Sequence, residues 1–334
     1  MNDTPPTTIL LTEAFHERYR DRVLATASEV GLALEPVLLA DDGSVASADL
    51  ERVELAHFSR DRYVAGGQPF FSALERAPQL RWLHVFHAGM NGRFYAQLLE
   101  RGVLLSNSAG SHAEPIAQTA IGALIWLARG FPDWQQAQRE RRWARVEAPN
   151  EPRDLRNQTI VIVGAGSIGT HLARLAGALG LHVVGVRRSP GRPGESFDEV
   201  RAPADLRDLL PRADWLALAC PLTDETRGMI DADALARLPR HARLINVARG
   251  PIIIEAALIE ALKSGSIAGA YLDVFDEEPL SQDSELWTLP QVILTPHNSA
   301  VSSGNDDRAT AMFLDNLGRW QRGESLTNQV TVVD

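Results

Sequence analysis

The chain has 334 residues, of which 45% are hydrophobic and 23% charged, and it carries a net charge of −10 at pH 7. At about 150 residues per domain this length suggests two domains, with one large domain as the alternative, and the balance excludes fibrous and disordered classes. The acidic charge argues against a nucleic-acid binder, and the single cysteine, Cys220, excludes internal disulfides and cysteine-rich metal frameworks.

The N-terminus and the apolar stretches bear on location. The first residues, MNDTPPTTILL, contain no basic segment and no long apolar core, so a signal peptide is not expected. The longest apolar stretch, Ile121–Ala128, is far shorter than the roughly 18 to 20 residues of a membrane span. We therefore expect a cytoplasmic protein with neither a membrane nor a nucleic acid as partner.

Short apolar runs alternate with helical patterns in the first third of the chain and predict an α/β unit that ends near Leu105. The expected strands are Ile9–Leu11, Leu34–Leu39, Arg62–Ala65 and Trp82–Phe86, and the expected helices are Glu13–Val30 and Phe70–Ala77. A long helix is predicted at Glu114–Arg129, with Pro115 in its first turn, where a missing N–H costs little. A polar helix is predicted from about Asp133 to Val146, followed by a loop at Glu147–Arg156.

The strongest alternation of strands and helices follows this loop. The expected strands are Thr159–Val163, His182–Val186, Trp215–Ala219, Arg243–Val247, Ala268–Val274 and Val292–Leu294. The expected helices are Ser167–Leu179, Asp231–Leu238, Glu255–Ser264 and about Ser302–Arg322. Nearly continuous apolar strands in repeated βα units predict a parallel sheet that helices cover on both faces.

A glycine-rich turn links the first strand of this region to its helix, in the sequence IVIVGAGSIG. Gly164 allows the tight turn, Gly166 lets the backbone approach a pyrophosphate, and Gly169 lets helix and strand pack closely. The helix start adds free N–H groups and a positive dipole end. The pattern predicts a dinucleotide-binding unit, and a glycine turn in another kind of βα unit is the alternative.

The end of the second strand bears on which dinucleotide binds. An NAD-specific unit usually has Asp or Glu about 20 residues after the glycines, but Arg187 stands 187 − 169 = 18 residues after Gly169, followed by Arg188 and Ser189. Guanidinium groups bind phosphate through bidentate, charge-assisted hydrogen bonds. We therefore predict NADP(H) in preference to NAD(H), with a solvated arginine loop as the alternative.

Polar residues follow three later strands, where an open parallel sheet directs side chains into its ligand crevice. Arg249 precedes the final glycine of the segment NVARG, Glu278 lies within LDVFDEEPL, and His297 follows LTP directly. Each residue alone has a plain structural explanation, such as a loop arginine or a capped loop histidine. The three together, in this order, indicate a catalytic site.

These motifs resemble those of the D-isomer-specific 2-hydroxyacid dehydrogenases. The matching segments are GAGSIG, CPLTDETRGMI (220–230), NVARGPIIIEAALIEAL (246–262), YLDVFDEEPL (271–280) and LTPHNSA (294–300), in the family's order. Two looser matches, LRWLHVFHAGMNG (80–92) and SNSAGSHAEPIAQTAIG (106–122), are similar to the family's substrate loop and linker helix. The arginine pair and the overall pattern look most like the NADP-dependent glyoxylate/hydroxypyruvate reductase branch. Gln118 and Asn298 differ from the residues that many members have.

The resemblance implies a division of chemical roles. Arg249 would bind the carboxylate and keto oxygen of a 2-oxo acid and stabilise the charge that grows on that oxygen. His297 would donate a proton in reduction and accept one in oxidation. Glu278 would orient the imidazole and favour its protonated form.

Further contacts are implied by matching positions. Asp273 would lie on the nicotinamide side, Val247 and Ala248 would line the ring pocket, and Cys220 with Pro221 would pack near the cofactor. The other expected cofactor contacts are Ser167, Ile168, His297, Ser299 and Ala300. The turn Ala88-Gly89-Met90 would present its N–H groups to the substrate carboxylate, with an ordinary loop as the alternative. No residue set has metal-ligand spacing, so no metal is expected.

The resemblance also implies an architecture of two Rossmann-like α/β domains with parallel sheets and a cleft between them. Residues 1–105 and 300–334 would form a discontinuous, flavodoxin-like substrate domain, and residues 106–299 a Rossmann cofactor domain. A homodimer is expected through the 113–146 helices, with Trp134 and Trp143 at the contact. The alternatives are a non-enzymatic nucleotide-sensing scaffold, like related transcriptional corepressors, and a relative that takes hydride from formate or phosphite.

Overall fold

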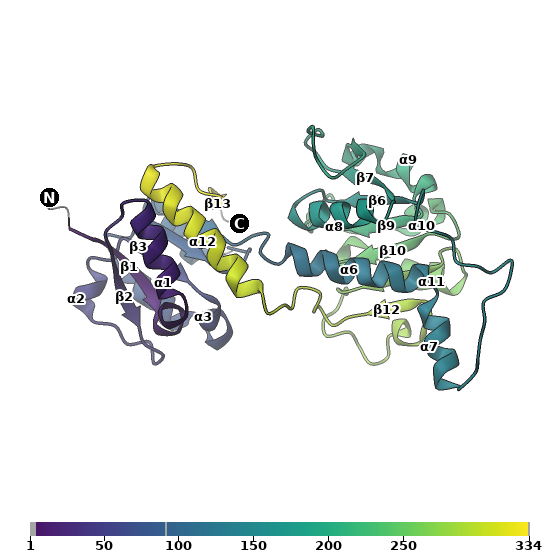
Figure 1. Ribbon diagram of the computed structural model, residues 1–334, viewed down its shortest axis with the longest axis horizontal. Coiled ribbons are helices and arrows are strands. Elements are labelled where there is room, and N and C mark those ends of the chain that lie inside the picture. Colours follow the sequence, from purple (N-terminus) through teal and green to yellow (C-terminus); the bar gives the residue numbers. More distant parts are fainter. Residues whose placement is uncertain (1–4, 91, 333–334) are drawn as a thin grey trace. The chain divides into compact units, whose positions relative to one another are not determined.

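The computed structural model describes residues 5–90 and 92–332 (Figure 1). The chain forms two compact units. One combines the N-terminal segment up to Ser111 with the C-terminal segment from Ser303, and the other is the continuous segment His112–Ser302. Each unit has its own sheet with helices packed on it, which confirms the predicted class of two α/β domains with mainly parallel sheets. None of the helices in the described part of the chain is both long and apolar enough to cross a membrane.

The first unit is built on a sheet with the strand order β13-β5-β4-β3-β1-β2. Its strands are β1 (Thr7–Thr12), β2 (Leu34–Leu39), β3 (Leu55–Phe58), β4 (Trp82–Val85), β5 (Leu104–Asn107) and β13 (Gln329–Val330). Its helices are α1 (Glu13–Glu29), α2 (Ser47–Leu50), α3 (Arg60–Ala65), α4 (Gln68–Glu75), α5 (Arg93–Glu100) and α12 (Asn305–Arg322). The first five strands run parallel in the order 2-1-3-4-5, as in flavodoxin-like folds, and β13 is antiparallel to β5.

Helix α12 brings the C-terminal part of the chain back to this unit. Its residues Phe313 and Leu317 share one buried cluster with Phe15 and Tyr19 of α1. These positions are four residues apart in each helix, so they lie on one helical face. Figure 1 shows the yellow helix α12 beside the purple helix α1.

The second unit is built on a parallel sheet with the strand order β12-β11-β10-β9-β6-β7-β8. Its strands are β6 (Thr159–Val163), β7 (His182–Val186), β8 (Glu199–Arg201), β9 (Trp215–Leu218), β10 (Arg243–Asn246), β11 (Gly269–Leu272) and β12 (Val292–Leu294). Its helices are α6 (Ala113–Ala128), α7 (Phe131–Arg139), α8 (Ser167–Ala178), α9 (Leu206–Leu209), α10 (Ala232–Arg237) and α11 (Glu255–Lys263). The direction of winding reverses between β6 and β9, and such a switch point places a ligand crevice at the carboxyl ends of these strands.

Both faces of this second sheet are buried, because successive side chains of a strand point to opposite sides. In β6, Ile160 and Ile162 belong to the cluster that α6 and α8 cover, whereas Val161 and Val163 belong to the cluster on the other face. The β6 side chains are therefore fixed on both sides, and the strand delivers the following glycine turn to a defined position.

Two predicted elements differ from the structure. Arg62–Ala65 belongs to helix α3 and is not a strand, and the strand is β3, just before it. A run of four residues has too little periodicity to separate helix from strand. The Arg62 guanidinium is buried and donates to the carbonyl groups of Ala40 and Asp41 at 2.6 and 2.9 Å, which fixes this helical turn beside the end of β2.

The polar helix predicted to reach Val146 ends at Arg139. Arg141 has a φ of 55°, and the amide of Arg142 donates to the carbonyl of Ala137 at 2.8 Å. A left-handed residue, followed by a residue whose amide donates to a carbonyl five residues earlier, is a common way for a helix to end. The charged sequence continues without a glycine or proline at this point, so the stop was not visible in the sequence.

Candidate active site

The glycine turn between β6 and α8 has the conformation that a phosphate site needs. Gly164 has a φ of 100°, and a Cβ atom there would lie 2.5 Å from backbone atoms of Ala219 and Cys220. A Cβ atom at Gly169 would overlap the carbonyl oxygen of Gly164. At Gly166, by contrast, no atom lies within 4 Å of the Cβ position, and α8 begins one residue later. The open face at the start of α8, with its free N–H groups, fits a pyrophosphate.

A cavity of about 710 Å³ lies beside this turn, at the carboxyl ends of β6, β7 and β9. The predicted cofactor residues that line it are Gly164, Gly166, Arg187, Arg188, Ser189, Cys220 and Pro221. Burial raises the pKa of the Cys220 thiol to about 11, so the thiol stays protonated near neutral pH and does not act as a nucleophile. The volume and the glycine turn together fit part of a dinucleotide.

The two arginines after β7 have different surroundings. The Arg187 side chain is only 16% exposed, and its Nη2 donates to both carboxylate oxygens of Glu195, at 2.8 and 2.7 Å. Arg188 is exposed and lines the cavity. Glu195 was not among the predicted site residues, because the sequence does not show which of several loop charges pair.

His297 and Glu278 form a hydrogen-bonded pair, with 2.7 Å between Nδ1 and Oε2. The other carboxylate oxygen accepts from the amide of Phe275 at 3.1 Å. Burial by itself would raise the pKa of Glu278. The hydrogen bonds from His297 and Phe275 and the charges of His297 and Arg249 outweigh burial, and the pKa of Glu278 is lowered. The carboxylate is therefore ionised near neutral pH, as required to orient and stabilise a protonated imidazole.

Asp273 holds the loop that carries His297. Its carboxylate is 2% exposed and accepts from the amides of Asn298 and Ser299, at 2.9 and 3.0 Å, and from both the Thr295 and Ser299 hydroxyls. The carbonyl of Asp273 accepts from the amide of His297 at 2.9 Å. His297 has a φ of 53°, an unusual conformation for a residue with a side chain, and these bonds hold it there.

Arg249 lies on a turn that Asn246 shapes and that packs against the Glu278 loop. The Asn246 side chain accepts from the amide of Ala248 and donates to the carbonyl of Arg249, both at 3.0 Å. A Cβ atom at Gly250 would overlap backbone atoms of Phe275, so the two loops touch backbone to backbone. The exposed Arg249 guanidinium lies near enough to lower the pKa of Glu278. The structure therefore brings the three predicted catalytic residues together.

Asn246 and Thr295 were not predicted to act in the site. Thr295 donates to Asp273 at 2.6 Å and lies 2.8 Å from the hydroxyl of Tyr271. Both residues are polar and stand at or just after the end of an apolar strand, Asn246 ending β10 and Thr295 following β12. That position is the sequence signal that could have identified them.

Two of the predicted catalytic residues also line a cavity. His297 and Glu278 lie on the wall of a second cavity, of about 640 Å³, whose further lining is mainly apolar. Its other lining residues are Phe275, Pro279, Leu280, Trp287, Leu294, Thr295 and Pro296.

Of the remaining predicted residues, Val247, Ala248 and Ser299 are buried and Ala300 is partly buried, and Ser167 and Ile168 begin α8. Ala88, Gly89 and Met90 belong to the first unit, where Met90 is buried and the carbonyl of Ala88 accepts from Asn107 at 2.7 Å.

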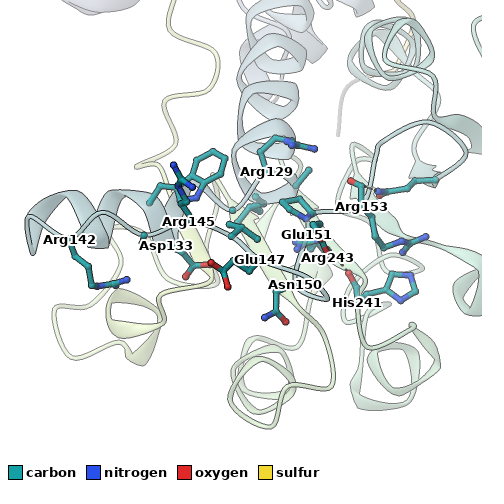
Figure 2. Close-up of a pocket in the computed structure, with 18 residues that line it drawn as sticks. Arg129, Asp133, Arg142, Arg145, Glu147, Asn150, Glu151, Arg153, His241 and Arg243 are labelled. Atoms are coloured by element: carbon teal, nitrogen blue, oxygen red, sulfur yellow. Dashed lines mark hydrogen bonds between the residues drawn. The ribbon is translucent and has the colours of Figure 1, made fainter.

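A third cavity, of about 480 Å³, is separate from these residues. It is lined by the end of α6, the start of α7, the following irregular segment, and residues at or before the amino ends of strands, such as Gln158 and Arg243. Figure 2 shows charged side chains grouped around it, among them Arg153 and Arg243. It lies at the amino ends of these parallel strands, opposite to the glycine turn, and none of the predicted site residues lines it.

Comparison with known proteins identifies the family. Residues 121–299 match the family model described as "D-isomer specific 2-hydroxyacid dehydrogenase, NAD binding domain". The chain belongs to the D-isomer specific 2-hydroxyacid dehydrogenase family. This confirms the resemblance seen in the motifs, and the dehydrogenase is an oxidoreductase with an NAD(P)-binding domain.

Individual relatives agree with this assignment. The dehydrogenase is 34% identical to a glyoxylate reductase of Korarchaeum cryptofilum, with 77% of this chain and 79% of the relative covered. It is similar to a solved D-isomer specific 2-hydroxyacid dehydrogenase of Xanthobacter autotrophicus in complex with NADPH and MES, with 30% identity, 98% of each chain covered and a TM-score of 0.73. It is also similar to an NADPH-dependent glyoxylate/hydroxypyruvate reductase of Sinorhizobium meliloti in complex with NADP and sulfate, with 27% identity, 98% of each chain covered and a TM-score of 0.67.

Proposed function

We propose that this dehydrogenase reduces a small 2-oxo acid, such as glyoxylate or hydroxypyruvate, to the D-2-hydroxy acid with NADPH. The observation that carries the proposal is the Glu278–His297 hydrogen bond of 2.7 Å beside Arg249, in the same unit as the glycine turn. The named activities of the Korarchaeum and Sinorhizobium relatives support the choice of substrate.

The proposed reaction adds one hydride and one proton to the keto group. Arg249 binds the substrate carboxylate and keto oxygen, because its planar fork can donate to both. His297 donates a proton to the keto oxygen from Nε2, since Nδ1 is engaged by Glu278. Glu278 stabilises the imidazolium before the transfer and keeps the ring oriented after it. When bound, the reduced nicotinamide supplies the hydride.

We propose NADPH as the preferred cofactor because of the residues that line the nucleotide cavity after β7. Arg188 and Ser189 are exposed there, and a guanidinium beside a hydroxyl can bind a 2′-phosphate. The two similar solved structures are complexes with NADPH and with NADP, which supports this choice. In the segment 187–201 the carboxylates of Glu195 and Glu199 are bound to arginine side chains and that of Asp198 accepts from the amide of Val183, so we expect none of them to accept from a ribose 2′-hydroxyl.

The direct test is the consumption of NADPH with a panel of 2-oxo acids. We expect turnover with glyoxylate or hydroxypyruvate, and we expect Arg249→Ala and His297→Ala each to lower kcat/KM by about 10²- to 10⁴-fold. The Kd for NADPH should change by less than about 3-fold, because neither side chain lines the nucleotide cavity. Glu277→Gln, a change to an exposed neighbour of Glu278, is the matched control. A folded protein that binds NADPH but reduces none of the acids would refute the proposal.

We also propose that the enzyme is a homodimer through the segment 113–146. Trp126, Trp134 and Trp143 are exposed there, Trp143 by 87%, and Trp126 stacks on Phe131 at 4.7 Å between ring centroids. Clustered exposed aromatic side chains are typical of protein contacts. Light scattering after gel filtration should give twice the monomer mass, and Trp143→Glu should shift the enzyme toward monomer. The cytoplasmic location stays a prediction. The binding of the substrate carboxylate by the turn Ala88-Gly89-Met90 also stays a prediction.

A further inference from the structure

The segment after β7 is folded around the Arg187 side chain. Its Nε donates to the carbonyl of Ser189 at 2.9 Å, and its Nη2 donates to the carbonyl of Pro190 at 2.7 Å. The same Nη2 faces both carboxylate oxygens of Glu195, and the amide of Arg192 donates to Glu195 at 3.1 Å. Arg187 is therefore the centre of a small closed loop, and most of its donors are directed into that loop.

The charge of Arg187 is compensated as well as its hydrogen bonds. The hydrogen bond from Arg187, followed by that from the amide of Arg192, holds the pKa of Glu195 below its ordinary value. Glu195 is therefore ionised at neutral pH and cancels the charge of the guanidinium beside it. A phosphate group could bind the Nε and Nη2 donors of Arg187 only by displacing Glu195 and the loop carbonyls, because both anions compete for the same donors.

Arg188 differs from Arg187 in each of these respects. It is exposed and lines the nucleotide cavity with Ser189. The two arginines are neighbours in the sequence and line the same cavity, but Arg187 is bound to Glu195 whereas Arg188 is exposed.

We propose that Glu195 sets the preference between NADPH and NADH, by holding Arg187 and withholding it from the 2′-phosphate, which Arg188 then binds. Glu195 is a positioning residue that acts through Arg187. The inference rests on the proposed NADP(H)-dependent function, and it names the residue that limits the strength of that preference.

The test measures the Kd values of NADPH and NADH by quenching of tryptophan fluorescence. Glu195→Gln removes the competing charge, so NADPH should bind about 10-fold more tightly while the Kd of NADH changes by less than about 2-fold. The combined change Arg187→Gln with Glu195→Gln should return NADPH affinity to within about 3-fold of the unmodified enzyme, because both charges are then absent. Arg188→Gln should weaken NADPH binding by about 10-fold or more and leave NADH binding unchanged.

Salt dependence and a control variant separate this mechanism from a general loss of negative charge. A released Arg187 adds a charge contact, so the Kd of NADPH should rise more steeply with salt in Glu195→Gln than in the unmodified enzyme. Glu225 also lines the cavity but is not bonded to Arg187, and Glu225→Gln should lack the steeper salt dependence. Glu195→Ser, with thermal melting of each variant, covers the case in which Glu195→Gln folds poorly.

The proposal is overturned if Glu195→Gln and Glu195→Ser leave the ratio of the two Kd values unchanged. It is also overturned if the combined variant loses as much NADPH affinity as Arg188→Gln, because Arg187 would then be a phosphate ligand in the unmodified enzyme. A failure of the proposed reduction would appear as an absence of turnover, which these binding measurements do not involve. The two failures are therefore distinguishable.

Discussion

Removing the Asp273 carboxylate should detach the His297 loop from the sheet. In Asp273→Ala the amides of Asn298 and Ser299 lose their acceptor, and the buried position of Asp273 and Ser299 leaves water little access to replace it. An unsatisfied buried amide costs about 1–3 kcal/mol, so the loss at Ser299, with a smaller loss at the exposed residue Asn298, should lower the free energy of unfolding by about 2–4 kcal/mol. This is a large part of the roughly 5–15 kcal/mol that stabilises a typical domain.

The same change should reach the chemistry through His297. With its loop released, His297 loses its left-handed backbone conformation and the hydrogen bond from its amide to the Asp273 carbonyl. Its imidazole is then no longer fixed beside Glu278. We expect kcat to fall by about 100-fold, a typical cost when a general acid is misplaced. The Kd for NADPH should stay within about 3-fold. Urea unfolding, steady-state kinetics and fluorescence titration give the three values.

Two variants show whether geometry or charge is responsible. Asp273→Asn keeps an oxygen where three of the donors converge, so it should lose less than half as much stability as Asp273→Ala. Asp276→Ala changes an exposed acid three residues along the chain and should leave all three values unchanged. If Asp273→Ala kept its kcat and stability but bound NADPH ten times more weakly, the reasoning would be wrong. The carboxylate would then act on the nicotinamide side, as the family resemblance implies.

Further predictions concern pH and the contact between the loops. Because the pKa of Glu278 is lowered in the folded protein, its contribution to stability is present above the ordinary carboxyl pKa and is lost as the pH falls through the lower value. Unfolding free energy should thus fall less below about pH 4.5 in Glu278→Gln than in the unmodified enzyme, and parallel curves would contradict this. Gly250→Ala should lower both the melting temperature and kcat/KM, the latter by more than about 100-fold, because its methyl group would overlap the Phe275 backbone. Gly177→Ala, at an exposed position inside α8, should leave kcat/KM unchanged and raise stability by about 0.5–1 kcal/mol. If the two glycine variants lost kcat/KM and stability equally, the backbone contact at Gly250 would not be the cause of the loss.

Much of the second unit could be predicted from its sequence because its signals are local. Strands β6 and β7 were predicted with their exact bounds, since β6 is an apolar run between Gln158 and Gly164 and β7 is a mainly apolar run that ends before Arg187. The five motif segments that include the glycine turn, Arg249, Glu278 and His297 likewise indicated the family, which the family model confirms. These features depend on neighbouring residues, so one sequence contains them.

Other features depend on residues that are distant in the chain or on competing local choices. The helix α3 was mistaken for a strand because the buried bonds of Arg62 to the end of β2 override a short apolar pattern. The engagement of Arg187 by Glu195 requires a particular loop path over eight residues, which composition does not specify. The support of His297 by Asp273 spans more than twenty residues and depends on the pairing of β11 with β12.

Because Gly250 has no side chain, two segments of the site pack directly against each other, and neither can move without the other. The turn that carries Arg249 and the loop that leads to Glu278 meet through their main chains, with no intervening atoms that could be exchanged for larger or smaller ones. A designer who wished to widen the distance between guanidinium and imidazole, for instance to accept a bulkier acid, would have to rebuild both segments at once. A point mutation elsewhere in either segment can change which groups the site presents, whereas any side chain at Gly250 would displace both segments together.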